Sequence, residues 1–192
     1  VECTGPVQHA GSMAPTDEQL MDAYRGGDAG AFDRLYDRYR GPVYRYLLRQ
    51  CRDETLCEEL FQDVWLKLIR GAHHWRSGDP LRPWLFRIAH NRLVDHWRQR
   101  REPEEAFDDN VVPMDAPRPD ALAHIRDCIE RLKALLGHLA APQRDAFLLK
   151  EEGGLSLEQI AEVTGVGRET VKSRLRYAVR RLRSGLEGCN DA

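Results

Sequence analysis

The sequence predicts an all-α protein made of two small helical domains joined by a flexible linker, with a helix-turn-helix in the carboxy-terminal domain. Apolar residues recur at three- and four-residue steps along almost the whole chain, and β-branched runs with a period of two are absent. Residues 102–120 hold seven acidic residues against Arg118 and four of the ten prolines, which is typical of a linker. The 192 residues are enough for one or two domains.

The amino-terminal half is predicted to form four amphipathic helices. Thr16 or Asp17 can cap the first helix, and glycines and prolines separate the later ones. We expect these helices to begin near Glu18 and Ala29 and to span about 54–70 and 84–101. The apolar stripe of the fourth helix, expected to be core, consists of Phe86, Ala89, Leu93 and Trp97.

Three further helical segments are predicted after the linker and before the last helix. The first carries an apolar stripe between Ile125 and Leu139, and a short helix over 142–150 follows. Ser156 with Gln159 has the spacing of a capping box, which predicts a helix start. Gly165 can supply the positive φ of a tight turn before a basic helix. This layout is that of a helix-turn-helix.

The basic helix after this turn is a candidate DNA-recognition helix. Residues 167–183 carry seven basic residues against Glu169. At about 100° per residue the apolar positions fall on one stripe, which leaves the opposite face to polar side chains. These polar residues are Glu169, Lys172, Ser173, Arg176 and Arg180. Lys and Arg can bind guanine edges in a major groove, although a solvated helix closing a three-helix bundle is the alternative.

The fourth helix offers a second candidate for nucleic-acid binding. Residues 80–101 carry six arginines against Asp95. Opposite the apolar stripe lie Trp84, Arg87, Asn91 and Arg98. An aromatic ring beside Arg and Asn suits stacking on an unpaired base and holding its backbone, whereas a core role for the tryptophan is the alternative.

Cysteine usage and hydropathy favour a cytoplasmic protein that is not inserted in a membrane. The five cysteines cannot all pair, and their irregular spacing is unlike that of a secreted scaffold. No apolar run approaches the roughly 20 residues that a membrane helix requires. Residues 1–16 are expected to be a disordered tail, in which an added segment precedes a natural start at Met13. Cys51 and Cys57 cannot share one helix face, so no metal or cofactor is predicted.

Taken in order, three segments resemble the bacterial sigma factors of the small extracytoplasmic-function group. They are CEELFQDVWLKLIR (57–70), RPWLFRIAHNRLVDHWRQRR (82–101) and LSLEQIAEVTGVGRETVKSRLRYAVRRL (155–182). The resemblance implies a region 2 domain over 17–101, which opens the minus-ten promoter element. It also implies an acidic linker over 102–125, a region 4 domain over 126–187 that recognises the minus-thirty-five element, and a tail over 188–192.

The same resemblance assigns residues to partners. It adds Arg92 to the minus-ten contacts and makes the loop 73–80 a wall of the pocket for an extruded base. The residues that it implies for docking on core RNA polymerase are Glu59, Gln62 and Asp63. Contacts to the minus-thirty-five element fall on Lys172, Ser173, Arg176 and Tyr177, with Arg168 and Glu169 in place of the family's smaller residues. An anti-sigma factor is a further expected partner.

The expected function is therefore that of a sigma factor, which binds core polymerase and promoter DNA and has no chemistry of its own. A free-standing helix-turn-helix regulator with a helical sensor domain is the alternative, but the sequence shows no palindromic dimerisation helix. An enzyme is disfavoured because the sequence lacks a phosphate-binding glycine loop, a metal-ligand spacing and a nucleophile with an evident base.

Overall fold

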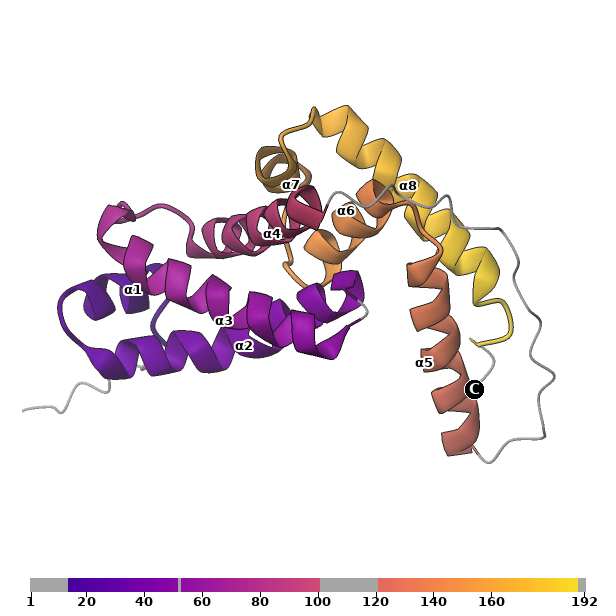
Figure 1. Cartoon of the computed structure of the whole chain (residues 1–192), viewed down its shortest axis with the longest axis horizontal. Coiled ribbons are helices and arrows are strands. Elements are labelled where there is room, and N and C mark those ends of the chain that lie inside the picture. Colours follow the sequence, from indigo (N-terminus) through magenta and orange to yellow (C-terminus); the bar gives the residue numbers. More distant parts are fainter. Residues whose placement is uncertain (1–13, 52, 101–120, 190–192) are drawn as a thin grey trace, which may run out of the picture.

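In the computed structural model, which describes residues 14–51, 53–100 and 121–189, every regular element is a helix (Figure 1). The all-α prediction is therefore confirmed. The elements are α1 (Asp17–Arg25), α2 (Ala29–Cys51), α3 (Glu54–Gly71), the 3₁₀-helix η1 (Ala72–His74), α4 (Leu81–Arg100), α5 (Ala121–Gly137), α6 (Ala141–Glu151), α7 (Leu157–Thr164) and α8 (Arg168–Gly185). None of them is both long and apolar enough to cross a bilayer.

Two predicted helix starts were wrong by a few residues. Helix α4 begins at Leu81 and not at residue 84, so Pro83 lies in its first turn, where the missing amide is not needed. Helix α5 begins at Ala121, so the last five residues of the predicted linker 102–125 are helical. Good helix formers follow the last proline there, which explains the early start. The rest of that linker and the tail 1–13 lie outside the described residues.

Side-chain caps fix the beginnings of three helices. Ser156 forms the predicted reciprocal capping box with Gln159. Thr16, one of the two caps expected for α1, also forms a reciprocal capping box, with Gln19. Asp53 caps α3 by accepting hydrogen bonds from two backbone amides. Each cap satisfies amide groups that have no partner inside the helix.

The buried residues of the amino-terminal half and of α6, α7 and the start of α8 form one continuous apolar cluster. In Figure 1, α7 lies beside the end of α4, and α6 packs against α2. A second, smaller cluster joins α5 to α8. The two predicted regions thus share a core in this structure, instead of being held together only by the linker.

Three residues expected to be buried are exposed. Trp97 was assigned to the core stripe of α4, but it is 47% exposed. It lies one turn beyond Leu93, near the end of the helix, where the neighbouring helices no longer cover that stripe. On α5, Ile125 and Ile129 are 51% and 47% exposed, and burial begins only at Leu136, near the end of the helix, and continues with Leu139 just after it.

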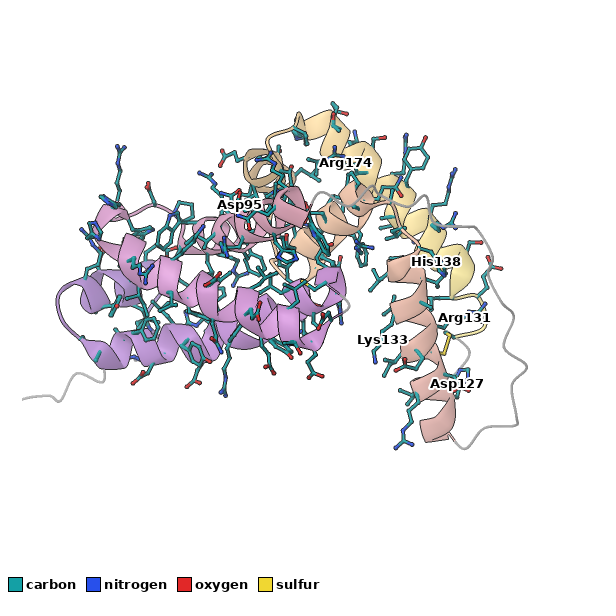
Figure 2. All side chains as sticks on the ribbon, viewed as in Figure 1. Asp95, Asp127, Arg131, Lys133, His138 and Arg174 are labelled. Atoms are coloured by element: carbon teal, nitrogen blue, oxygen red, sulfur yellow. A yellow bond between two sulfur atoms is a disulfide. The ribbon has the colours of Figure 1, made fainter. Side chains whose placement is uncertain are left out.

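A disulfide joins Cys128 of α5 to Cys189 near the carboxy terminus (Figure 2). The cysteine pattern had favoured a reducing environment and gave no sign of this pair, because the two residues are 61 positions apart. Cys51 and Cys57 are free and buried. Burial raises the pKa of the Cys51 thiol to about 12 and that of the Cys57 thiol to about 11. No group of side chains in the described part of the chain has the arrangement of a metal site.

Candidate nucleic-acid interface

Helix α8 presents its predicted recognition face to solvent. Its other side is held by Val171, Ala178 and Leu182, which are buried, as their helical spacing predicted. Gly165 precedes the helix with a φ of 68°, so the tight turn of the helix-turn-helix also forms as predicted. Gly167, at the N-cap, makes no side-chain cap.

The exposed side of α8 brings two of its arginines together over one aromatic ring. Arg176 and Arg180 lie over the ring of Tyr177, with guanidinium carbons 5.7 Å and 5.3 Å from its centroid. Tyr177 is itself exposed, and Ser173 lies half-buried one turn before it. Stacking on the ring orders these long side chains before any ligand binds.

The first turn of α8 is tied by ion pairs. Arg168 donates to Glu158 of α7 at 2.6 Å and to Glu169 at 3.1 Å, and Lys172 lies 3.8 Å from Glu169. The hydrogen bond from Arg168 lowers the pKa of Glu158. Arg168 and Lys172 are therefore already paired with carboxylates, whereas Arg176 and Arg180 project beyond them.

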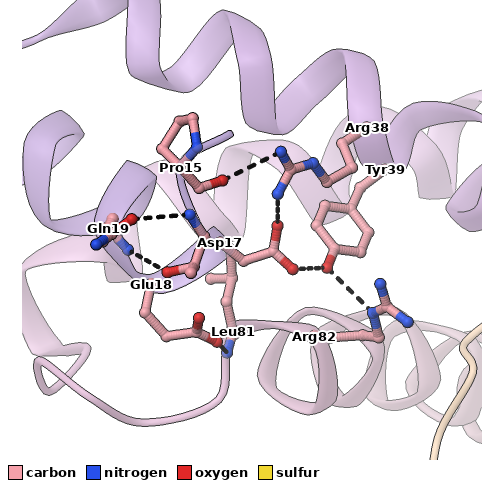
Figure 3. A network of polar contacts seen from close by, with 9 residues as sticks. Pro15, Asp17, Glu18, Gln19, Arg38, Tyr39, Leu81 and Arg82 are labelled. Atoms are coloured by element: carbon pink, nitrogen blue, oxygen red, sulfur yellow. Dashed lines mark hydrogen bonds and ion pairs between the residues drawn. The ribbon is translucent and has the colours of Figure 1, made fainter. Parts of the chain in front are cut away.

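The start of α4 is positioned by a polar network that ties together three helices (Figure 3). The carboxylate of Asp17 accepts hydrogen bonds from Arg38 and from the hydroxyl of Tyr39, and Arg82 donates to that hydroxyl at 3.1 Å. Burial, and then the bond to Asp17, raise the pKa of Tyr39 to about 12. Glu18 accepts from the backbone amide of Leu81 at 3.3 Å. The first turn of α4 is thus fixed against α1 and α2.

The predicted single-strand face of α4 is partly open. Trp84 is half-buried against the core and lies over Gly71, where an added Cβ would come 3.3 Å from its ring. Trp84 therefore packs against the core and is still open to stacking on a base, which were the two alternatives that the sequence left open. Arg87, Asn91 and Arg98 are exposed, and all three line an open groove of about 530 Å³.

The loop before α4 contributes one aromatic residue to the core, with only a small part of it reaching a groove. Trp75 is only 3% exposed, so its ring cannot stack on a base. His74 and Arg76 line a second groove of about 320 Å³ together with Trp84. Ser77 anchors the loop by donating to Asp22 of α1 at 2.6 Å.

Two residues assigned to different partners contact each other. Arg92, expected at the minus-ten element, pairs with Asp63, expected at polymerase. The side chain of Arg92 is 22% exposed, which leaves it less available to DNA than Arg87. Glu59 and Gln62 are exposed on α3.

Two apolar residues on the same side of α3 were not among the predicted site residues. Leu66 and Ile69 are 46% and 41% exposed, and they continue the three- and four-residue steps that begin at Glu59 and Gln62. Exposed aliphatic side chains next to polar ones are typical of a protein-binding surface. Their helical spacing from Glu59 could have placed both residues on this face from the sequence alone.

Comparison with protein families matches both halves of the chain. Residues 35–102 match Sigma-70 region 2, and residues 129–182 match Sigma-70 region 4. The chain is 33% identical over 171 residues to the ECF RNA polymerase sigma factor SigK of Mycobacterium sp. (strain KMS), which covers 84% of each protein. It is 30% identical to SigM of Mycobacterium tuberculosis, over 92% of this chain and 87% of that protein.

Solved structures show the same fold. The sigma factor RpoE of Bartonella quintana, in complex with the anti-sigma factor NepR, superposes with a TM-score of 0.63 and 25% identity, covering 81% of this chain and 96% of that chain. CnrH, in complex with the cytosolic domain of CnrY, gives a TM-score of 0.66 at 23% identity, covering 92% and 99%.

Proposed function

The chain belongs to the extracytoplasmic-function group of bacterial RNA polymerase sigma factors. From this we propose which of its residues contact promoter DNA and which contact core polymerase. A protein of this family directs core polymerase to specific promoters and helps to open the DNA, with no catalytic activity of its own. We assign region 2 to residues 17–101 and region 4 to residues 126–187. Promoter DNA and core polymerase are in the cytoplasm, where this protein would act.

Region 4 would recognise the minus-thirty-five element through α8. The observation that supports this is the exposed group around Tyr177, in which Arg176 and Arg180 extend from the side of the helix opposite its buried stripe. Lys172 and Ser173 lie one turn earlier, where a recognition helix enters the major groove. Arg168 and Glu169 would orient this first turn, because both are held in ion pairs.

Region 2 would hold the opened minus-ten element along α4. Trp84 offers a half-buried ring at the start of the helix, and Arg87 and Asn91 follow at the spacing of one turn. Arg98 continues this face toward the end of the helix. A protein can offset the cost of unstacking a duplex by capturing the freed strand in this way.

Core polymerase would dock on α3. Glu59 and Gln62 supply polar contacts, and Leu66 and Ile69 supply exposed apolar area beside them. Asp63 would contact core polymerase on this surface and also hold Arg92 in an ion pair. We also propose an anti-sigma factor as a partner, because RpoE of B. quintana is bound to one.

The decisive experiment is promoter-specific transcription with purified components. Core polymerase with this protein should initiate from a defined set of fragments of the source genome, and core polymerase alone should not. The mapped start sites should share two upstream sequence blocks. Absence of any specific transcript would contradict the proposal, as would a footprint of the isolated protein bound to duplex DNA as a dimer.

A further inference from the structure

A histidine lies against the disulfide that joins α5 to the segment after α8. The Nε2 atom of His124 is 3.8 Å from the sulfur of Cys128, and Cys128 is bonded to Cys189. All three residues are half-buried, whereas the residues between His124 and Cys128 are exposed. Figure 2 shows this disulfide beside α5. One imidazole and two sulfur atoms from distant parts of the sequence therefore meet at one place.

Helical geometry places His124 and Cys128 on the same face of α5. The two residues are four positions apart, so their side chains lie one turn apart, one above the other. Two histidines at this spacing on a helix bind a single zinc ion in metalloproteases. Cys51 and Cys57, the pair on which the prediction of no metal rested, are six positions apart and do not share a face.

The distance between the imidazole and the sulfur is close to one edge of a zinc coordination tetrahedron. Zinc lies about 2.0 Å from an imidazole nitrogen and about 2.3 Å from a thiolate sulfur. At a tetrahedral angle, these bond lengths put the nitrogen and the sulfur about 3.5 Å apart. The separation of 3.8 Å between His124 and Cys128 is slightly larger, so a small rotation of either side chain is enough to admit the ion.

The oxidation state of the two cysteines decides whether these groups can hold a metal. A metal binds thiolates, and a disulfide offers none. With the disulfide intact, no side-chain cluster among the described residues has the arrangement of a metal site. A dithiol reductant supplies two electrons and two protons, is itself oxidised to a disulfide, and leaves Cys128 and Cys189 as separate thiols. Each thiol releases its proton when it binds a metal.

The first half of α5 has few other means of attachment. It exposes Ile125 and Ile129, and the residues that α5 contributes to the smaller apolar cluster lie in its second half. Reduction removes the covalent link between Cys128 and the segment after α8. An ion bound by both sides would hold them together at the same point. Such a pair is kept reduced in a cytoplasm, where we propose that the protein acts.

We propose that the reduced protein binds one zinc ion through His124, Cys128 and Cys189, in place of the disulfide. Two thiolates and an imidazole favour zinc over magnesium or calcium, which take oxygen ligands. Three protein ligands leave the fourth position of the tetrahedron to water. The ion joins α5 to the segment after α8 and stabilises the reduced fold. The site contains none of the residues proposed to contact DNA or polymerase, so the proposed function does not depend on it.

Titration of the reduced full chain with cobalt(II) tests this site. The protein is reduced with dithiothreitol, desalted under nitrogen and titrated with cobalt, which accepts the same tetrahedral ligands as zinc. Bound thiolates are then detected by their charge-transfer absorption. The reduced wild type should bind a single cobalt ion per chain, and zinc should displace it. The oxidised wild type should give no charge-transfer absorption, because its sulfurs are bonded to each other.

The histidine distinguishes a three-ligand site from a pair of thiols that captures metal unaided. His124→Ala should weaken cobalt binding by about tenfold or more, since even residues that only orient a ligand contribute that much. His138→Ala, just after the same helix, is the matched control and should bind like the wild type. His124→Cys should bind cobalt with stronger charge-transfer absorption, because it supplies a third thiolate. Cys51→Ala with Cys57→Ala should keep the site, since these thiols are not part of it.

Urea unfolding followed by circular dichroism gives an independent measurement. Zinc should raise the urea midpoint of the reduced wild type, because a ligand that binds only the folded chain stabilises it. The midpoints of the oxidised wild type and of reduced His124→Ala should stay unchanged when zinc is added.

Three outcomes would overturn the inference. They are failure of the reduced wild type to bind stoichiometric cobalt, equal cobalt affinity of His124→Ala and the wild type, and an equal effect of zinc on the oxidised and reduced proteins. Circular dichroism shows whether His124→Ala is folded. Should it not fold, His124→Cys carries the test, because a spectrum without the third thiolate would equally contradict the site. Promoter-specific transcription by the wild type tests the proposed function separately, and its failure would leave the metal-binding results intact.

Discussion

At the residue scale, the arrangement of α8 separates side chains that organise the helix from those that can reach DNA. Arg168 is held between two carboxylates, whereas Arg176 and Arg180 rest on an exposed ring. A guanidinium on a ring keeps its donors free at its edge, so it can still form the paired hydrogen bonds that guanine accepts.

Replacement of Arg176 should therefore affect sequence recognition and nothing else. Arg176→Ala is expected to weaken binding of particular minus-thirty-five base pairs by about 1 to 3 kcal/mol. Competition between promoter variants in transcription with core polymerase measures this loss, and Arg174→Ala, which lies off the face, is the matched control. Loss of polymerase binding by Arg176→Ala would contradict the assignment of α8.

The Arg92–Asp63 pair allows a structural role to be separated from a docking role. Asp63→Arg should impair polymerase binding, because it puts a cation beside Arg92 on the proposed docking surface. The double exchange Asp63→Arg with Arg92→Asp restores an ion pair of reversed direction. If Asp63 touches polymerase directly, affinity measured by fluorescence anisotropy should stay low in the double variant. Full recovery would show that Asp63 acts only by holding Arg92.

At the scale of elements, α5 depends on its attachment to α8 more than on its own apolar stripe. Its first half exposes Ile125 and Ile129, and its second half packs against α8 in the smaller cluster. Gly185 allows this approach, since an added Cβ would come 2.4 Å from the side chain of Leu135. The disulfide from Cys128 to Cys189 joins α5 covalently to the segment that follows α8.

Reduction of this disulfide should destabilise region 4. A crosslink between residues 61 positions apart stabilises a fold by up to about 4 kcal/mol through loss of chain entropy in the unfolded state. Urea unfolding with and without a reductant measures the change. The double variant Cys128→Ser with Cys189→Ser should resemble the reduced wild type and show no response to reductant. A wild-type transition insensitive to reductant would contradict the prediction.

At the scale of the whole molecule, the shared core couples the two regions. All four tryptophans lie between residues 65 and 97, so their fluorescence reports region 2 alone, whereas circular dichroism reports every helix. The two signals should give coincident unfolding transitions in the wild type, because the regions lose their common cluster together.

Tryptophan fluorescence and circular dichroism also provide the control, in a variant that weakens the contact between the two regions. In Glu152→Lys, which should lose the contact of Glu152 with Arg45 and Arg49, the fluorescence and circular dichroism transitions are expected to separate. Separate transitions in the wild type would show that the two regions fold independently and that the packing in Figure 1 contributes little stability.

Sequence by itself determined the elements and their order. Helical spacing, the capping box at Ser156 and the turn at Gly165 are local signals, and the structure contains each of them. The buried stripe of α8 followed from the same periodicity, which then fixed its exposed face. Periodicity failed at Trp97 and Ile125, because it identifies an apolar face without saying whether another helix covers it.

Only the tertiary structure decided which elements meet. The pairing of Asp145 with Tyr46, of Arg92 with Asp63 and of Cys128 with Cys189 joins residues far apart in sequence, where no local pattern operates. The packing of α7 against α4 has the same origin, since it depends on apolar surface and buried charge from both halves at once. Local backbone and side-chain preferences act over a few residues, whereas burial depends on the complete fold.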